Sequence, residues 1–353
     1  MSKNAQLRSL RRIRPTRAIA LLFIAVLILK ASSPGEPIAT ADETSQSKPA
    51  RFLHEWGKQG NEPGEFHFPI GIAINQVDEV FVADHYNNRV QRFDSDGKLL
   101  AHFEVLPNPG GIAVDESGNL YVSHFPAARL SKDATPDRVS VYSSDGKLLR
   151  EWGKSGTGDG ELNWPGGIAI SRTGRVYVAD QTNRRVQVFD REGNFLLKWG
   201  EYGTQPGQFG GNTSEKSRVG GPQFIAIDAE GNVYTTEASV GRVQKFTSEG
   251  KFLLAWGDNE DKPGSLGRKF QGKNLQGPIG ICIDKQGRVW VSTAGGRIQQ
   301  FTESGKYLRG IGDQPGSKPG EFLAPHGIAI NCRGHLFVVD AYNHRIQKFD
   351  VAE

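Results

Sequence analysis

Apolar and polar positions follow a pattern that recurs six times along this chain from residue 69 onward. Each copy begins with a proline and a short apolar run, which a polar turn separates from a second apolar run. Successive copies begin 40 to 57 residues apart, a period typical of solenoids, propellers and other arrays. The copies open at Pro69, Pro109, Pro165, Pro222, Pro278 and Pro325.

Each copy predicts four β-strands, as the third copy illustrates. Residues 165–170 form an apolar run that is too short and too rich in β-branched residues for a helix. Residues 176–180 are the second apolar run, and residues 185–190 alternate in polarity, which is typical of a strand with one face more exposed. A turn at Gly193, where a positive φ angle is expected, leads to the fourth strand at 195–200. Four antiparallel strands in every repeat predict the blade of a β-propeller.

The two ends of the repeat array indicate how the ring closes. The sixth copy reaches residues 349–353 without a fourth strand, whereas residues 52–57, ahead of the first copy, match the fourth strand at 148–153. The N-terminal strand is therefore predicted to complete the last blade, which leaves no open sheet edge. The predicted fold class is all-β, a closed six-bladed β-propeller of four-stranded antiparallel blades over residues 51–353.

The second half of each copy carries a polar motif, Asp-x-x-Asn-x-Arg, seen from Asp84 to Arg89. Residues 84–93, 180–187 and 340–347 resemble the core of an NHL repeat. The resemblance covers residues 51–353, because the Pro-x-Gly-Ile opening, the polar motif and a Trp-Gly ending recur together. It implies a propeller that binds proteins, or RNA in some cytoplasmic members, or that has metal-dependent lyase activity, as in the related peptidyl-α-hydroxyglycine amidating lyases.

The first 41 residues differ from the repeats. A basic head that ends at Arg17 precedes an uninterrupted apolar run at residues 18–29. Twelve helical residues span about 18 Å, less than the roughly 30 Å of a bilayer core, so a signal peptide is favoured over a signal anchor for residues 1–41. Residues 42–50 are expected to be a flexible tether. We therefore expect a secreted or periplasmic protein, or a membrane-tethered one if the N-terminal segment is retained.

The net charge of +4 belongs to this N-terminal segment. Residues 1–41 carry seven Lys or Arg and one Glu, so the remaining chain has a net charge of −2. This charge gives no electrostatic argument for a nucleic-acid partner. The expected partner is an unidentified protein, peptide or small-molecule ligand, and the expected state is a monomer. The membrane is a partner only through an uncleaved N-terminal segment.

An arginine occupies the same position of the polar motif in all six copies. Active sites are singular, so a residue present in every blade is expected to be structural, with its guanidinium pairing an acid or capping carbonyls between blades. These structural arginines are Arg89, Arg138, Arg185, Arg242, Arg297 and Arg345.

Function is expected where the copies differ. The connections that enter blades four and five are enlarged, and an insertion between residues 125 and 137 lies in blade two. All three are predicted to share one face of the propeller, which marks that face as the binding surface. Side chains at the second residue of each opening and at the end of each second strand are expected to lie there. The candidate ligand-binding residues are Asp84, His85, His124, Gln223, Glu237, His326 and Asp340.

The resemblance to the amidating lyases suggests a metal at this face. Their zinc is held by two Pro-His openings and one histidine at a strand end, and His326 and His124 match one position of each kind. The third position holds Gln223, a poor zinc ligand beside imidazole, and Gln181-Thr182 stands where the family has its catalytic Tyr. We favour an exported propeller that binds a protein or ligand. A zinc- or calcium-dependent lyase or hydrolase with His124 and His326 as metal ligands is the alternative.

Overall fold

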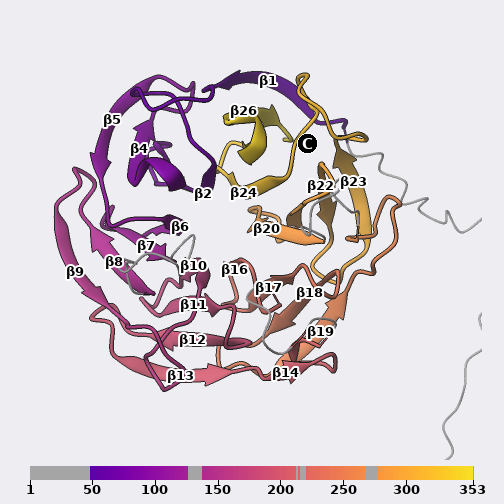
Figure 1. Cartoon of the computed structure of the whole chain (residues 1–353). Coiled ribbons are helices and arrows are strands. Elements are labelled where there is room, and N and C mark those ends of the chain that lie inside the picture. The colour runs from indigo at the N-terminus through magenta and orange to yellow at the C-terminus, as the bar shows by residue number, and fades with distance from the viewer. Residues whose placement is uncertain (1–47, 126–136, 212–213, 215–219, 268–276, 353) are drawn as a thin grey trace, which may run out of the picture. The chain divides into compact units, whose positions relative to one another are not determined.

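The computed structural model describes residues 48–125, 137–211, 214, 220–267 and 277–352. These residues form six four-stranded antiparallel sheets arranged as blades around a central axis (Figure 1). The predicted all-β, six-bladed propeller is confirmed. The predicted signal peptide or anchor at 1–41 lies outside the described residues, as does most of the tether. No helix among the described residues is long and apolar enough to cross a membrane.

In every blade, the first strand lies next to the axis and the second strand pairs with it. The inner strands are β2 (Pro69–Ile74), β6 (Pro109–Val114), β10 (Pro165–Ile170), β16 (Ile225–Ile227), β20 (Pro278–Ile283) and β24 (Pro325–Ile330). The second strands are β3 (Val80–Asp84), β7 (Leu120–His124), β11 (Val176–Asp180), β17 (Val233–Glu237), β21 (Val289–Thr293) and β25 (His335–Asp340).

The third and fourth strands complete each blade toward its outer edge. The third strands are β4 (Arg89–Phe93), β8 (Arg138–Tyr142), β12 (Arg185–Phe189), β18 (Arg242–Phe246), β22 (Arg297–Phe301) and β26 (Arg345–Asp350). The outer strands are β5 (Leu99–Glu104), β9 (Leu148–Trp152), β13 (Phe195–Trp199), β19 (Phe252–Trp256), β23 (Tyr307–Ile311) and β1 (Arg51–Trp56). The remaining elements are the short parallel pair β14 (Tyr202–Gly203) and β15 (Phe209–Gly210) and the 3-10 helices η1 (His85–Asn87) and η2 (Ala341–Asn343).

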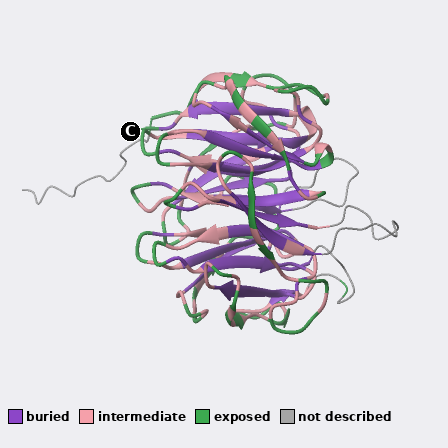
Figure 2. Cartoon of the chain, turned by 90° about the vertical axis from the view of Figure 1, so that its left-hand side faces the viewer, coloured by how far each residue is buried: buried purple, intermediate pink, exposed green. Residues whose placement is uncertain are grey.

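Burial follows the position of each strand in its blade. Side chains of the second and third strands are almost all buried, whereas β13 alternates between partly buried and exposed residues along its length. Figure 2 shows the buried strands stacked as layers, with exposed residues in the connecting turns. The apolar cores lie between neighbouring blades. One cluster joins Val139 and Val141 of blade two to Ile168 and Val178 of blade three.

Tryptophans of the outer strands connect neighbouring blades. The ring of Trp152 in blade two lies against the turn at Gly193 in blade three, where an added Cβ atom would come within 2.6 Å of the ring. Gly193 has a φ angle of 91°, so this position needs glycine for both backbone and space. Trp56, Trp199 and Trp256 cover the equivalent glycines of the next blades. At four of the junctions between blades, a tryptophan of one outer strand thus packs against the turn of the next blade.

The strand β1 lies at the outer edge of the sixth blade. It pairs antiparallel with β26, with Arg51 opposite Asp350 and Trp56 opposite Ile346. The sixth sheet therefore has the order β1-β26-β25-β24 and joins the two ends of the propeller in one blade. The indigo and yellow strands lie side by side in Figure 1.

Candidate functional site

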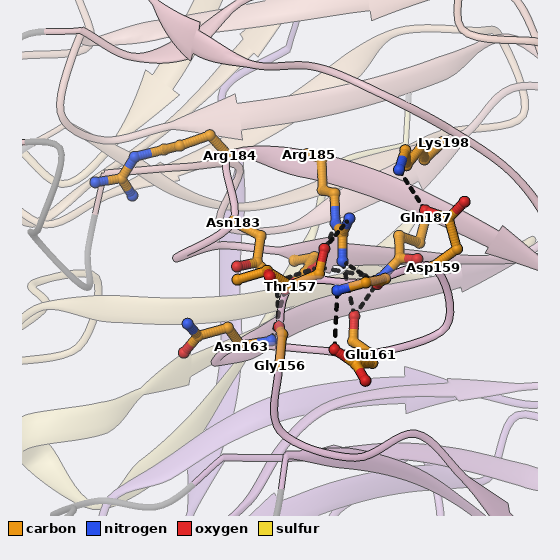
Figure 3. A network of polar contacts seen from close by, with 12 residues as sticks. Gly156, Thr157, Asp159, Glu161, Asn163, Asn183, Arg184, Arg185, Gln187 and Lys198 are labelled. Carbon is orange, nitrogen blue, oxygen red and sulfur yellow. Dashed lines mark hydrogen bonds and ion pairs between the residues drawn. The ribbon is translucent and has the colours of Figure 1, made fainter.

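The upper face of the propeller is defined here as the side on which the inner strands begin and the second strands end. On this side, an entry loop joins the outer strand of each blade to the inner strand of the next. The loop that enters blade three, residues 153–164, is held by the polar motif of its own blade (Figure 3). Arg185 donates hydrogen bonds to the carbonyl oxygens of Thr157, Gly158 and Glu161 at 2.8–2.9 Å.

Asp180, at the end of a second strand, is the anionic centre of this network. Its Oδ2 accepts from Arg185 Nε at 2.7 Å and from the side-chain amides of Asn183 and Gln187. Its Oδ1 accepts from the backbone N–H of Asn163 at 2.7 Å. The carboxylate is fully buried and all its partners belong to the blade and its entry loop. These contacts hold the entry loop against its blade and leave the carboxylate unavailable to a ligand.

Three of the predicted ligand-binding residues occupy the same position in other blades. Asp84, Glu237 and Asp340 are fully buried, and each carboxylate pairs with the arginine of its own blade at 2.7–2.9 Å. Burial raises the pKa of Glu237 and Asp340, and the paired guanidinium lowers it in opposition. The structure therefore places these three side chains in the entry-loop networks and not at the axis.

Blades two and five lack the acid. His124 and Thr293 stand at the strand ends, and the corresponding arginines turn to carboxylates that are far more exposed. Arg138 pairs with Glu151 at 2.5 Å, and Arg297 pairs with Asp261 at 2.9 Å. The six arginines thus divide into four buried pairs and two peripheral ones.

His124 is enclosed beneath the short entry loop of blade two. Its Nδ1 lies 3.3 Å from the carbonyl oxygen of Pro107, and its Nε2 is buried without a hydrogen-bond partner among the described residues. Burial lowers the pKa of His124 to about 4, so the imidazole is neutral at neutral pH. Its side chain faces the entry loop, as the acids of the other blades do.

The residue before each opening proline forms the rim of the upper face around the axis. Phe68 and Trp164 hold this position with φ angles of 56° and 60°, in the left-handed region that bulky residues rarely adopt. A side chain of the preceding blade secures each N–H. Phe68 donates to His344 Nδ1 at 3.1 Å, and Trp164 donates to Asp137 Oδ1 at 2.8 Å.

A continuous series of ring contacts, called the aromatic arc below, runs along this rim from blade six to blade three. Successive ring centroids lie 5.0, 5.5, 4.7, 5.1 and 5.8 Å apart. His326 joins the series through Phe68, at 5.3 Å. The arc comprises, in spatial order, Tyr342, Phe68, Tyr86, His85, Phe125 and Trp164, with His326 beside Phe68.

Two predicted ligand-binding residues, His85 and His326, belong to the arc. His85 Nδ1 lies 3.0 Å from the carbonyl oxygen of Pro109, and His326 Nδ1 lies 2.8 Å from that of Ala324. A carbonyl oxygen only accepts, so Nδ1 carries the proton in both rings and Nε2 keeps its lone pair. Burial lowers the pKa of His85 to about 4 and also lowers the pKa of His326, so both rings are neutral at neutral pH.

Gln223, the remaining candidate, lies where blade four departs from the repeat. The inner strand β16 has only three residues, and Phe224 replaces the glycine found at this point in the other five blades. Gln223 is partly buried, and its carbonyl oxygen accepts from the N–H of Gly167 in blade three at 2.7 Å. Its backbone thus joins two blades, next to the axis.

The predicted metal ligands were tested against the geometry. Within the described ranges, no group of three or more His, Cys, Asp or Glu side chains is arranged to hold a metal ion. His124 faces its entry loop, His326 belongs to the arc, and the acids nearby are paired with arginine. His124, His326 and the nearby acids therefore do not fit the three-histidine zinc set that the lyase resemblance implies.

Much of the three enlarged loops lies outside the described residues, at 126–136, 212–213, 215–219 and 268–276. The prediction that they elaborate one face stays a prediction. Phe68 and Trp164 were missed by sequence reasoning, although a signal was present. The residue before the opening proline is glycine in blade five and asparagine in blade two, which indicates a positive φ angle.

The fold and the repeated polar networks define the class, a six-bladed β-propeller built from sequence repeats. The NHL repeat model matches residues 66–93, 162–189 and 322–349, so the chain carries NHL repeats in blades one, three and six. It is 24% identical to mouse E3 ubiquitin-protein ligase TRIM32 over 323 residues, which is 84% of this chain and 44% of the ligase. The chain thus matches less than half of that relative.

Two further comparisons extend this assignment. A stretch covering 36% of the chain is 31% identical, over 142 residues, to mouse peptidyl-glycine alpha-amidating monooxygenase, of which it covers 13%. A solved structure of a Bacteroides thetaiotaomicron protein of unknown function matches with a TM-score of 0.65 and 18% identity. That match covers 86% of this chain and 76% of the other, and at this identity it shows the fold alone.

Proposed function

We propose that this chain is an exported NHL-repeat propeller that binds a ligand or a protein segment at the axial end of its upper face. The observation that carries the proposal is the aromatic arc. Seven ring side chains from blades six, one, two and three gather at this rim and interrupt the repeat, whereas the repeated acids and arginines are engaged in the fold. Binding sites on repeat scaffolds are expected where the repeat is broken.

Export is supported by the basic head and the apolar run of residues 18–29, which resemble a signal peptide. The coverage of the relatives gives the amidating-lyase alternative less support. The likeness to TRIM32 spans most of the chain, whereas that to the amidating monooxygenase covers about a third of it. A lyase of the amidating type would need a metal set that the described residues do not assemble.

The lower face offers a rival site that a test must separate from the arc. The turns between first and second strands of blades three to five border a groove of about 700 Å³, lined by Arg172, Asp228, Glu230, Asp284 and Glu303. The groove is lined by side chains of both charge signs, and these residues belong to turns that recur in the repeat. Both features favour a groove that results from the repeated fold over a ligand site.

A thermal-shift screen of small molecules on the full chain tests the proposal. A ligand at 100 times its Kd stabilises the folded state by about 2.7 kcal/mol, which shifts the melting temperature measurably. We expect stabilising compounds to lose their effect on Phe125→Ala, in the arc, and to keep it on the matched control Arg172→Ala, in the lower groove. Stabilisation that survives Phe125→Ala but disappears in Arg172→Ala would contradict the proposal, as would a screen without any stabilising compound.

A further inference from the structure

We propose that the aromatic arc binds an uncharged, planar aromatic ring that bears an N–H or O–H donor, either as a free molecule of the phenol or indole type or as a side chain of a peptide. This inference rests on the proposed function and specifies the chemistry of its ligand. It follows from three observations, namely the backbone cost of the rim, the arrangement of the rings and the neutrality of the two imidazoles in the arc.

The first observation is that the chain retains aromatic residues where they strain the backbone. A left-handed conformation costs of order 1–3 kcal/mol for a bulky residue, and glycine or asparagine would avoid most of that cost. In blades two, five and six, Asn108, Gly277 and Ala324 adopt the same conformation, with φ angles of 57°, 74° and 49°. Trp164 is only partly buried and belongs to none of the core clusters of the described residues. The ring of Phe68 also packs against the core between blades six and one, whereas Trp164 has a ring contact with Phe125, in the arc. Strain of this kind gathers at binding sites.

The second observation is how the rings are arranged. Phe68 and Tyr86 stack at an interplanar angle of 27°, and Phe68 meets Tyr342 and His326 edge to face. Tyr86 is 48% exposed, so the arc is accessible at its centre. Aromatic rings favour offset-stacked or edge-to-face neighbours with centroids 4.5–7 Å apart. The same geometry allows one further ring to extend the series.

The third observation concerns charge and hydrogen bonding. Burial lowers the pKa of both imidazoles in the arc, His85 and His326, so neither ring is charged at neutral pH. The nearest repeat acids, Asp84 and Asp340, are neutralised by Arg89 and Arg345. An ionic ligand would find no counter-charge among these groups, whereas the Nε2 lone pairs of His85 and His326 can each accept a hydrogen bond. An uncharged ring with a donor satisfies both conditions.

Calorimetric titration of the full chain at pH 7.5 with matched probes tests the ligand class. The probes are indole and p-cresol, with cyclohexanol as a donor of similar size without an aromatic face and tetramethylammonium as a cation. We expect indole and p-cresol to bind at least about fivefold more tightly than cyclohexanol, since an aromatic pair adds to simple burial. Equal binding of cyclohexanol, or tighter binding of tetramethylammonium, would overturn the ring inference while leaving a ligand site on the upper face intact.

Variants separate binding from structure. Trp164→Asn installs the residue that blade two already carries at this position, so we expect the melting temperature to stay level or rise while the Kd for indole increases at least about fivefold. Tyr202→Asn removes an exposed aromatic residue from the entry loop of blade four and is expected to leave the Kd unchanged. A lower melting temperature in Trp164→Asn would assign Trp164 a structural role and overturn the inference, as would an unchanged Kd.

The hydrogen-bond donor and the source of the ring are tested in the same way. The double variant His85→Phe/His326→Phe keeps both rings in the arc but removes both Nε2 acceptors, so indole and its N-methylated form are expected to bind this variant alike, whereas the wild type prefers indole. Equal affinities of the wild type for indole and for its N-methylated form would contradict the role of the imidazoles as acceptors.

Titration with a short peptide containing one tryptophan distinguishes a peptide ligand from a free aromatic molecule. Tighter binding than indole indicates a peptide ligand, and weaker binding indicates a free molecule.

Discussion

Replacing Arg185 by methionine is expected to lower the free energy of unfolding by about 3–5 kcal/mol, because removing one partner of a buried ion pair leaves an uncompensated charge. The substitution strands the Asp180 carboxylate, which is fully buried. It also removes the donor that holds the carbonyl oxygens of Thr157, Gly158 and Glu161. Chemical denaturation monitored by tryptophan fluorescence measures the loss.

Arg297→Met is the matched control, because it changes the same position of the repeat in blade five. Arg297 pairs with Asp261, whose side chain is 55% exposed, and exposed pairs contribute about 0–1 kcal/mol. We therefore expect Arg297→Met to cost at most about 1 kcal/mol. In the double variant Asp180→Asn/Arg185→Met, part of the stability should return, since the stranded charge is gone. Equal losses for Arg185→Met and Arg297→Met would refute the division into buried and peripheral pairs.

Deleting residues 51–57 is expected to be more damaging than any single substitution. The deletion removes the outer strand of blade six, including Trp56, whose ring lies against Phe93 and Phe337, and the Glu55 carboxylate that pairs with Arg345. Trp56 is partly buried against a core cluster, so its loss adds up to the roughly 3–5 kcal/mol that removal of a fully buried aromatic side chain costs. The unpaired edge of β26 would also become a template for association between chains. We expect aggregation, or a melting temperature lower by at least about 10 °C, in light scattering and calorimetry.

A permuted chain provides the control for this deletion. Residues 50–57 are moved behind residue 353 and joined through a copy of the turn at 190–194, so that blade six has the connectivity of blades one to five. We expect the permuted chain to melt near the wild-type temperature as a monomer. A deletion variant that is itself monomeric and melts normally would show that β1 does not close the ring.

The fold could be predicted from the sequence because the information is repeated six times. The six prolines set the inner strands, and their spacing defines the blades. The pattern predicted too long an inner strand in blade four, because Phe224 replaces a glycine there and the strand shortens to Ile225–Ile227. In the other blades, glycine at this position lets neighbouring inner strands approach each other closely. An added Cβ atom at Gly71 would lie only 2.3 Å from the carbonyl oxygen of Gly110. Phenylalanine cannot occupy that space.

The site was less accessible to sequence reasoning. Repeat position indicates which residues end the second strands, but not where their side chains turn. Asp84, Glu237 and Asp340 are held by arginines that follow five residues later, and those contacts direct them toward the entry loops. The placement of Phe68 and Trp164 at the rim depends on the backbone conformation at these two residues. Only comparison of Phe68 and Trp164 with glycines of other copies carries that information.

The most direct test of a ligand site on the upper face is a crystal structure of the full chain soaked with indole. The structure predicts an indole ring against the aromatic arc, within about 4.5–7 Å of the rings of Phe68, Phe125 or Trp164, with its N–H directed to Nε2 of His85 or His326. Indole bound instead in the lower groove beside Arg172 and Asp228, or bound nowhere on the propeller, would contradict it.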